Sequence, residues 1–162
     1  MASPTSPIEY TLLPLKRYAQ FSGRSGRAEF WWFTLVTTAA GLFLDFIDRA
    51  MGSEYGLLGV IFTLGLFIPS LSVSVRRLHD IGISGWWMLA VIAPAMFFGM
   101  MSSFAALETE FNGGSAASPS LLWISLLVIA CLAMVVVLVL PGTKGQNKYG
   151  EDPYAGGAVR AV

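Results

Sequence analysis

Four long apolar segments restrict the fold of this chain more than any other feature. They cover residues of about 30–47, 57–75, 86–104 and 121–140. A helix needs about 20 predominantly apolar residues to cross a hydrocarbon layer about 30 Å thick. Lipid offers no hydrogen-bond partners, so a single apolar segment can satisfy its backbone only as a helix. The sequence therefore predicts an all-α membrane protein with a bundle of four transmembrane helices.

Charged residues are scarce, and their placement predicts an orientation. They form 12% of the chain, about half the ~25% of an average soluble domain. Threading the four spans puts nine of the ten Lys and Arg residues on one side and leaves Arg49 on the other. Because cytoplasmic loops are enriched in Lys and Arg, we predict that both termini are cytoplasmic. The 10 basic and 10 acidic residues cancel, so net charge gives no argument for nucleic acid.

The remaining stretches are short tails and one short helix. We predict a disordered tail at residues 1–7, a single four-helix membrane domain at 8–153, and a flexible C-terminal tail at 154–162. Residues 8–21 mix apolar side chains with Lys16 and Arg17, which favours a short helix lying in the membrane interface. Pro14 fits this helix if it falls in the first helical turn.

Three polar segments lie on the predicted cytoplasmic side. Their sequences are FSGRSGRAEFW at 21–31, RRLHDIGISGW at 76–86 and GTKGQNKYGEDP at 142–153. If the chain crosses the membrane four times, these three segments lie on the same side of the membrane, and there we expect a functional site. The candidate ligand- or lipid-binding residues are Arg24, Arg27, Arg76, Arg77, His79, Lys144 and Asn147, and the candidate clamp residues are Glu29, Asp80 and Asp152.

The same three segments, in this order, resemble the YhaH-like family of bacterial inner-membrane proteins, a domain of unknown function. The resemblance runs from about residue 10 to 153, nearly the whole chain. Glu151 departs from the family's pattern, in which we expect proline between Gly150 and Asp152. The resemblance implies a small polytopic membrane protein and supplies no established activity.

The simplest interpretation of the charged face is a structural clamp that ties the helix ends together. Opposite charges from segments distant in sequence can pair there. Arg76 and Asp80 also have i,i+4 spacing if the second helix continues beyond the membrane.

A second interpretation is an anion site. Arginine binds phosphate through paired donors, and the glycine-rich turn at 22–27 can offer backbone N–H groups at a helix start. The ligand would be a phospholipid headgroup or a small phosphorylated molecule. The same turn is also compatible with a loop that only caps its own helix.

Catalysis is the weakest interpretation. His79 and Asp80 are adjacent, so on a helix they point about 100° apart and form no dyad; Glu29 or Asp152 would have to orient the ring. The single Cys131 and single His79 give no metal-ligand spacing. We therefore predict no metal and no cofactor, and we favour a non-enzymatic protein over an enzyme.

Polar and helix-breaking residues within the spans leave two further alternatives open. Asp45 lies near the outer end of the first span, where it either serves an ion pathway or pairs with Arg49. Pro69 and Pro94 interrupt the second and third spans, which is compatible with a transporter gate or with kinked helices that simply pack.

The sequence as a whole predicts a non-enzymatic, multi-pass protein of the bacterial inner membrane. Its partners are membrane lipids, anionic phospholipid among them, and homo-oligomers are compatible with it. The alternative function is an oligomeric small-molecule or ion transporter or channel subunit.

Overall fold

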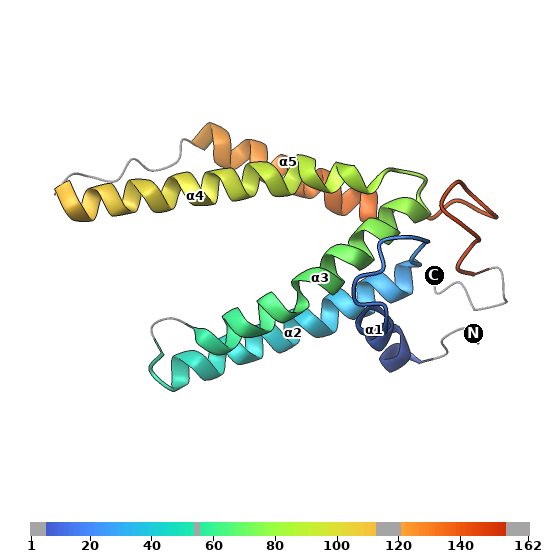
Figure 1. Ribbon diagram of the computed structural model, residues 1–162, viewed down its shortest axis with the longest axis horizontal. Coiled ribbons are helices and arrows are strands. Elements are labelled where there is room, and N and C mark those ends of the chain that lie inside the picture. The colour runs from blue at the N-terminus through green and yellow to red at the C-terminus, as the bar shows by residue number, and fades with distance from the viewer. Residues whose placement is uncertain (1–5, 54–55, 113–120, 155–162) are drawn as a thin grey trace. The chain divides into compact units, whose positions relative to one another are not determined.

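The computed structural model describes residues 6–53, 56–112 and 121–154, and in these it consists of helices and loops (Figure 1). The only β interaction in these ranges is an isolated bridge between Asn147 and Gly150. The all-helical prediction is therefore confirmed for the described residues. The elements are α1 (Pro7–Lys16), α2 (Arg27–Ala50), α3 (Leu57–Asp80), the 3-10 helix η1 (Gly85–Met88), α4 (Leu89–Asn112) and α5 (Leu121–Val139).

The chain forms two compact units. The first contains Met1–Gly85 and Pro141–Val162, and the second contains Trp86–Leu140. In the first unit, α2 and α3 lie side by side as an antiparallel pair, and α1 packs on both of them (Figure 1). In the second unit, α4 packs along α5. The predicted single four-helix domain stays a prediction.

Helix α1 begins with a capping box. Ser6 Oγ accepts a hydrogen bond from Glu9 N at 3.2 Å, and Glu9 Oε2 accepts one from Ser6 N at 3.4 Å. Ser6 and Pro7 thus belong to the start of this helix and not to the predicted tail. The helix ends at Lys16, earlier than predicted, and Pro14 lies in its second half, so the condition that Pro14 falls in the first helical turn is not met.

The long helices extend beyond the predicted spans. Helix α2 starts at Arg27 after an uncapped Gly26, and α3 continues to Asp80. Gly82 ends α3 with a φ of 86°, a left-handed conformation that favours glycine. Ile83 N then donates to the carbonyl of Leu78 at 2.9 Å and closes the helix. The last turn of α3, which carries several charged residues, is therefore closed by a glycine cap.

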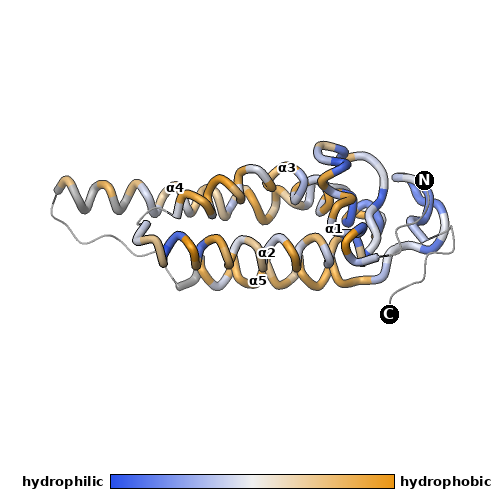
Figure 2. The backbone as a smooth tube through the Cα atoms, turned by 90° about the horizontal axis from the view of Figure 1, so that it is seen from below, coloured by the Kyte–Doolittle hydropathy of each residue, from blue (hydrophilic) through white to orange (hydrophobic). Residues whose placement is uncertain are grey.

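Three of the described helices are long and apolar enough to cross a membrane: Arg27–Ala50, Leu57–Asp80 and Gly85–Phe104. A fourth apolar helix, Ile124–Val139, is shorter. Figure 2 shows hydrophobic residues along most of these helices. Helix α4 runs on to Asn112, past the predicted end at 104, and residues 113–120 lie outside the described part. Several membrane-length helices agree with the prediction.

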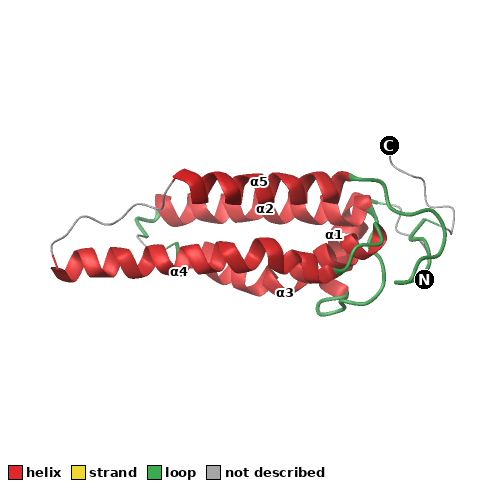
Figure 3. Ribbon diagram, turned by 90° about the horizontal axis from the view of Figure 1, so that it is seen from above, coloured by secondary structure: helices red, strands yellow, loops and turns green. Residues whose placement is uncertain are grey.

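In this chain many large apolar side chains are exposed and several charged side chains are buried, the reverse of a soluble domain. Many large apolar side chains of α2, α3, α4 and α5 are exposed, which suits helices whose solvent is lipid. Figure 3 shows loops gathered around one end of α3, its C-terminal end, where the loop at 141–154 also lies. Most of the buried charge lies at this end. Its buried polar residues are Arg24, Ser25, Glu29, Ser72, Arg76, Arg77 and Asp80.

Candidate functional site

The last turn of α3 supplies the centre of the candidate site. Arg76 and Arg77 are 0% exposed and Asp80 is 1% exposed. Charged side chains are almost never buried to this degree unless they are paired. Their partners come from the loop before α2, from the first turn of α2 and from the C-terminal loop at 141–154.

Asp80 holds two guanidinium groups. Its Oδ1 accepts from Arg24 Nε at 2.9 Å and lies 2.8 Å from Arg24 Nη2. Its Oδ2 accepts from Arg77 Nη1 at 2.5 Å. One carboxylate thus joins the loop before α2 to the end of α3. Charge-assisted contacts of this kind are the strongest hydrogen bonds that a protein makes.

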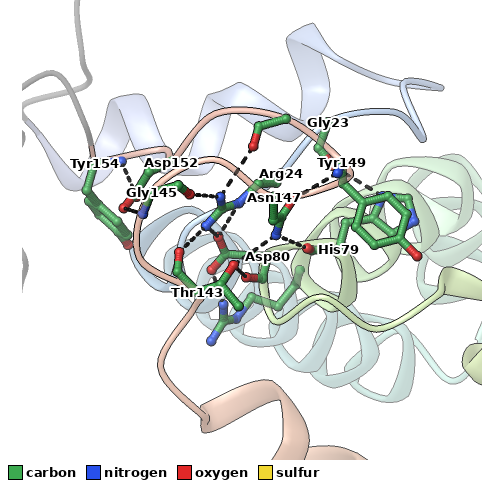
Figure 4. Close-up of polar contacts among 12 residues, drawn as sticks. Gly23, Arg24, His79, Asp80, Thr143, Gly145, Asn147, Tyr149, Asp152 and Tyr154 are labelled. Atoms are coloured by element: carbon green, nitrogen blue, oxygen red, sulfur yellow. Dashed lines mark hydrogen bonds and ion pairs between the residues drawn. The ribbon is translucent and has the colours of Figure 1, made fainter.

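Arg24 also reaches the C-terminal loop (Figure 4). Its Nη2 donates to the carbonyl of Thr143 at 2.5 Å. Its Nη1 donates to the carbonyls of Gly145 at 2.5 Å and Gly150 at 3.4 Å. With the two contacts to Asp80, these match the five N–H donors of a guanidinium. Arg24 is therefore saturated by the protein itself.

The C-terminal loop also caps the end of α3. The backbone carbonyl of Asp80 accepts from Thr143 N at 2.9 Å and from Thr143 Oγ1 at 3.0 Å. The carbonyl of His79 accepts from Asn147 Nδ2 at 3.0 Å. The final carbonyls of a helix have no partner within the helix. The loop satisfies two of them, so its docking and the end of α3 depend on each other.

Arg76 points to a different partner. Its Nη1 donates to Glu29 Oε1, in the first turn of α2, at 2.7 Å. Arg17 Nη1 lies 3.9 Å from the other oxygen of the same carboxylate. The i,i+4 pair of Arg76 with Asp80 is therefore not the pairing in the structure, since Asp80 bonds Arg24 and Arg77. We call Arg24, Glu29, Arg76, Arg77 and Asp80 the polar clasp.

The other candidate residues lie around the clasp. The imidazole of His79 stacks on the ring of Tyr149 with 3.9 Å between centroids and 5° between planes. His79 Nδ1 lies 3.2 Å from the carbonyl of Gly23. The carboxylate of Asp152 accepts from the backbone N–H groups of Gly145 at 3.2 Å and Tyr154 at 2.9 Å. His79 and Asp152 thus help to shape the docked loops.

A small cavity of about 70 Å³ opens beside the clasp. Three basic side chains line it, Arg24, Arg27 and Lys144, together with the carboxylates of Asp80 and Asp152. No hydrogen bond or ion pair engages the side chains of Arg27 and Lys144 in the part of the chain that the structure describes. The cavity is therefore lined by one arginine, Arg24, whose donors are all used within the protein, and by two basic side chains, Arg27 and Lys144, that could bind an anion.

Four of the predicted ligand-binding residues do not line this cavity: Arg76, Arg77, His79 and Asn147. Four lining residues were not predicted: Pro141, Gly142, Thr143 and Tyr154. Tyr154 was assigned to the flexible tail, yet its hydroxyl accepts from Ala28 N at 3.4 Å. A Cβ on Gly26 would lie 2.5 Å from this hydroxyl, so the glycine admits the ring. The uncapped glycine before α2 was the available signal that a distant group satisfies the helix start.

Comparisons with known proteins agree with the membrane assignment. The family described as "Protein of unknown function (DUF805)" matches residues 18–151. Inner membrane protein YhaI of Escherichia coli (strain K12) is 33% identical over 149 residues, which are 92% of this chain and 98% of that protein. Inner membrane protein YhaH of the same strain is 30% identical over 150 residues, with 90% and 97% covered.

A third relative, the uncharacterized protein YiiR of the same strain, is 30% identical over 145 residues, 82% of this chain and 84% of that protein. No solved structure matches the chain significantly. The match at 18–151 contains most of the three polar segments, so the resemblance that they carry is confirmed. Names of relatives and apolar helices together indicate a multi-pass protein of the inner membrane. The chain belongs to the DUF805 family of inner-membrane proteins of unknown function.

Proposed function

We propose that this chain is a non-enzymatic inner-membrane protein with a two-part charged face. The polar clasp locks the C-terminal loop to α2 and α3. The cavity beside it binds the phosphate group of an anionic phospholipid. The observation that carries the proposal is that some of the basic residues are buried in ion pairs and others are not. Arg24 and Arg77 are buried and paired with Asp80, whereas Arg27 and Lys144 line the cavity without a partner among the described residues.

Burial supports the structural role of the clasp. Removing one member of a buried ion pair leaves an uncompensated charge and costs about 3–5 kcal/mol. Asp80 contacts both Arg24 and Arg77, so its loss would remove an ion pair from each of these buried arginines. The backbone carbonyl of Asp80, a clasp residue, also accepts two hydrogen bonds from Thr143. Asp80 precedes the second unit in the sequence and Thr143 follows it, since that unit spans Trp86–Leu140. The two chain connections into the second unit are thereby held together.

The size of the cavity supports a headgroup phosphate over a whole soluble metabolite. The cavity measures only about 70 Å³. Pockets for whole small molecules measure roughly 300–1,000 Å³. A single phosphate group fits the smaller space, and the rest of a lipid would remain outside it. Arg27 and Lys144 would supply the charge, and the dipole of α2, which begins at Arg27, would add to it.

The charge distribution supports a cytoplasmic location for this face. Nine of the ten Lys and Arg residues fall on the side of the clasp when four spans are threaded. Anionic lipids of the inner leaflet attract basic residues by about 1 kcal/mol each. General attraction is therefore expected at any exposed lysine, and the test must separate it from a site.

The experiment is lipid retention measured by native mass spectrometry of the purified protein. We expect the double variant Arg27→Gln with Lys144→Gln to retain phosphatidylglycerol about tenfold more weakly than wild type, a loss of about 1.4 kcal/mol. The matched control is Arg49→Gln with Lys148→Gln, which removes the same charge away from the cavity. Phosphatidylcholine measures general lipid affinity, and glycerol phosphate tests for a soluble source of the same group.

Equal losses in the two double variants would mean general electrostatic attraction and would overturn the lipid site. Tighter binding of glycerol phosphate than of phosphatidylglycerol would instead assign the cavity to a soluble ligand. Neither outcome affects the clasp, whose test is thermal stability.

A further inference from the structure

A groove lies along the paired helices α2 and α3, on their own surface and away from the polar clasp. Its volume is about 360 Å³, within the range of roughly 300–1,000 Å³ that is usual for small-molecule sites. Its walls are mostly apolar and include Leu42 from α2 with Phe62, Leu66 and Phe67 from α3. The groove therefore has the size and lining of a site for a hydrophobic molecule.

One carboxylate lines this groove. Asp45 lies five residues before the end of α2, at Ala50, and its side chain is exposed. Its Oδ1 lies against Gly59 of α3, where a Cβ would collide with it. No hydrogen bond or ion pair engages the Asp45 carboxylate within the described residues, so the pair with Arg49, one of the alternatives left open by the sequence, is absent there. An acid at membrane depth without a counter-charge is costly, and it is a functional candidate for that reason.

The neighbouring acid has a different role. Asp48 is 4% exposed, and its Oδ2 accepts from Gly59 N at 3.1 Å. Gly59 is the third residue of α3, so Asp48 satisfies one of the free N–H groups at the start of that helix. Asp48 does not line the groove. Of two acids one helical turn apart, Asp48 thus caps α3 and Asp45 lines the groove.

We infer that this groove binds a lipophilic cation, with the charge against Asp45 and the hydrophobic body between Phe62, Leu66 and Phe67. The carboxylate selects the sign of the charge, because an anion would be repelled and a neutral molecule would leave Asp45 without a counter-charge. The apolar walls select a hydrophobic body, and Thr63 offers a hydroxyl beside it. The inference is independent of the phosphate cavity, which lies beside Asp80 at the C-terminal end of α3, whereas residues 62–70 of α3 line the groove.

The test uses two probes of nearly the same shape and opposite charge. Tetraphenylphosphonium and tetraphenylborate are each titrated against the purified full-length protein in phosphatidylcholine nanodiscs. Empty nanodiscs give the membrane partitioning of each probe. We expect saturable binding of tetraphenylphosphonium and no saturable binding of tetraphenylborate. Saturable binding of both probes with equal affinity, or of neither, would overturn the inference.

Variants then locate the site. Asp45→Asn should weaken tetraphenylphosphonium binding by about tenfold or more. The matched control Asp48→Asn removes the same charge one turn away, and its amide oxygen can still accept from Gly59 N–H. Its affinity should therefore stay close to wild type. Leu66→Trp keeps both acids but fills the groove, and it should also abolish saturable binding. Equal losses in the Asp45 and Asp48 variants, or an unchanged affinity in Asp45→Asn, would contradict the assignment.

Discussion

Tyr18 donates a hydrogen bond from its hydroxyl to the backbone carbonyl of Gly65, in the middle of α3, at 2.6 Å. In an unbroken helix this carbonyl would accept from the N–H of residue 69. Residue 69 is proline, which has no N–H. Because lipid cannot replace the lost bond, the phenol supplies it. The segment after α1 is therefore fixed to α3 at the point where the helix itself lacks a donor.

This relationship predicts the effect of Tyr18→Phe. The variant keeps the ring but leaves the Gly65 carbonyl without its donor, which should lower the unfolding free energy by about 1–3 kcal/mol. The measurement is thermal unfolding in detergent. In a Pro69→Ala background the restored helical N–H can reach the carbonyl, so the same change should cost much less. An equal cost in both backgrounds would show that the proline is not the reason for the contact.

Arg24→Lys should be destabilising although it conserves the charge. The guanidinium makes four hydrogen bonds and a further ion-pair contact, and an ammonium group has only three N–H donors. Losing two contacts at about 1 kcal/mol each should lower the unfolding free energy by about 2 kcal/mol.

The C-terminal loop should also loosen in this variant, so trypsin should cleave faster after Lys144 and Lys148. Arg27→Lys is the matched control, because Arg27 lies three residues away and lines the cavity without a partner among the described residues. Identical stability and cleavage rates in the two variants would count against the role of Arg24 in holding the loop.

Gly142→Ala should separate the C-terminal loop from α3. A Cβ at this position would collide with the carboxylate of Asp80. The carboxylate cannot move away cheaply, because it is held by Arg24 and Arg77. We expect a loss of about 1–3 kcal/mol in unfolding free energy, measured by thermal unfolding. Gly99→Ala provides the control, because nothing lies within 4 Å of its added Cβ; a similar loss there would point to a general intolerance of alanine.

The helices could be predicted from sequence because apolar length alone determines them. A run such as 57–75 has no other structure available in lipid. The helix ends were less accurate, since they depend on polar residues whose partners are distant. Helix α3 continues to Asp80 because Thr143 and Asn147 satisfy its last carbonyls. The sequence around residue 80 does not predict that these two distant side chains bond the end of the helix.

The meeting of the three polar segments follows from threading the spans, but the choice of partners does not. Spacing on a helix suggests Arg76 with Asp80, yet Arg76 bonds Glu29 and Asp80 bonds Arg24. Which acid an arginine contacts depends on how closely each loop packs against the helix ends, and this is a property of the tertiary structure. Tyr154 shows the same limit, since its contact with the start of α2 depends on the docked loop.

Topology is the remaining prediction, and it rests on the asymmetry of the basic residues. Single cysteines replace Gly113, in the connection between α4 and α5 and outside the described residues, and Gln146, in the C-terminal loop. The background is Cys131→Ala, because Cys131 is a free, exposed thiol. If the chain crosses the membrane four times, nine of its ten basic residues lie on the clasp side, and the positive-inside rule then predicts that Gln146 is cytoplasmic. An impermeant thiol reagent should therefore label position 113 in intact cells and position 146 only after lysis. Labelling in the reverse order would put the clasp and its cavity on the periplasmic face, where the anionic inner leaflet could not be their partner.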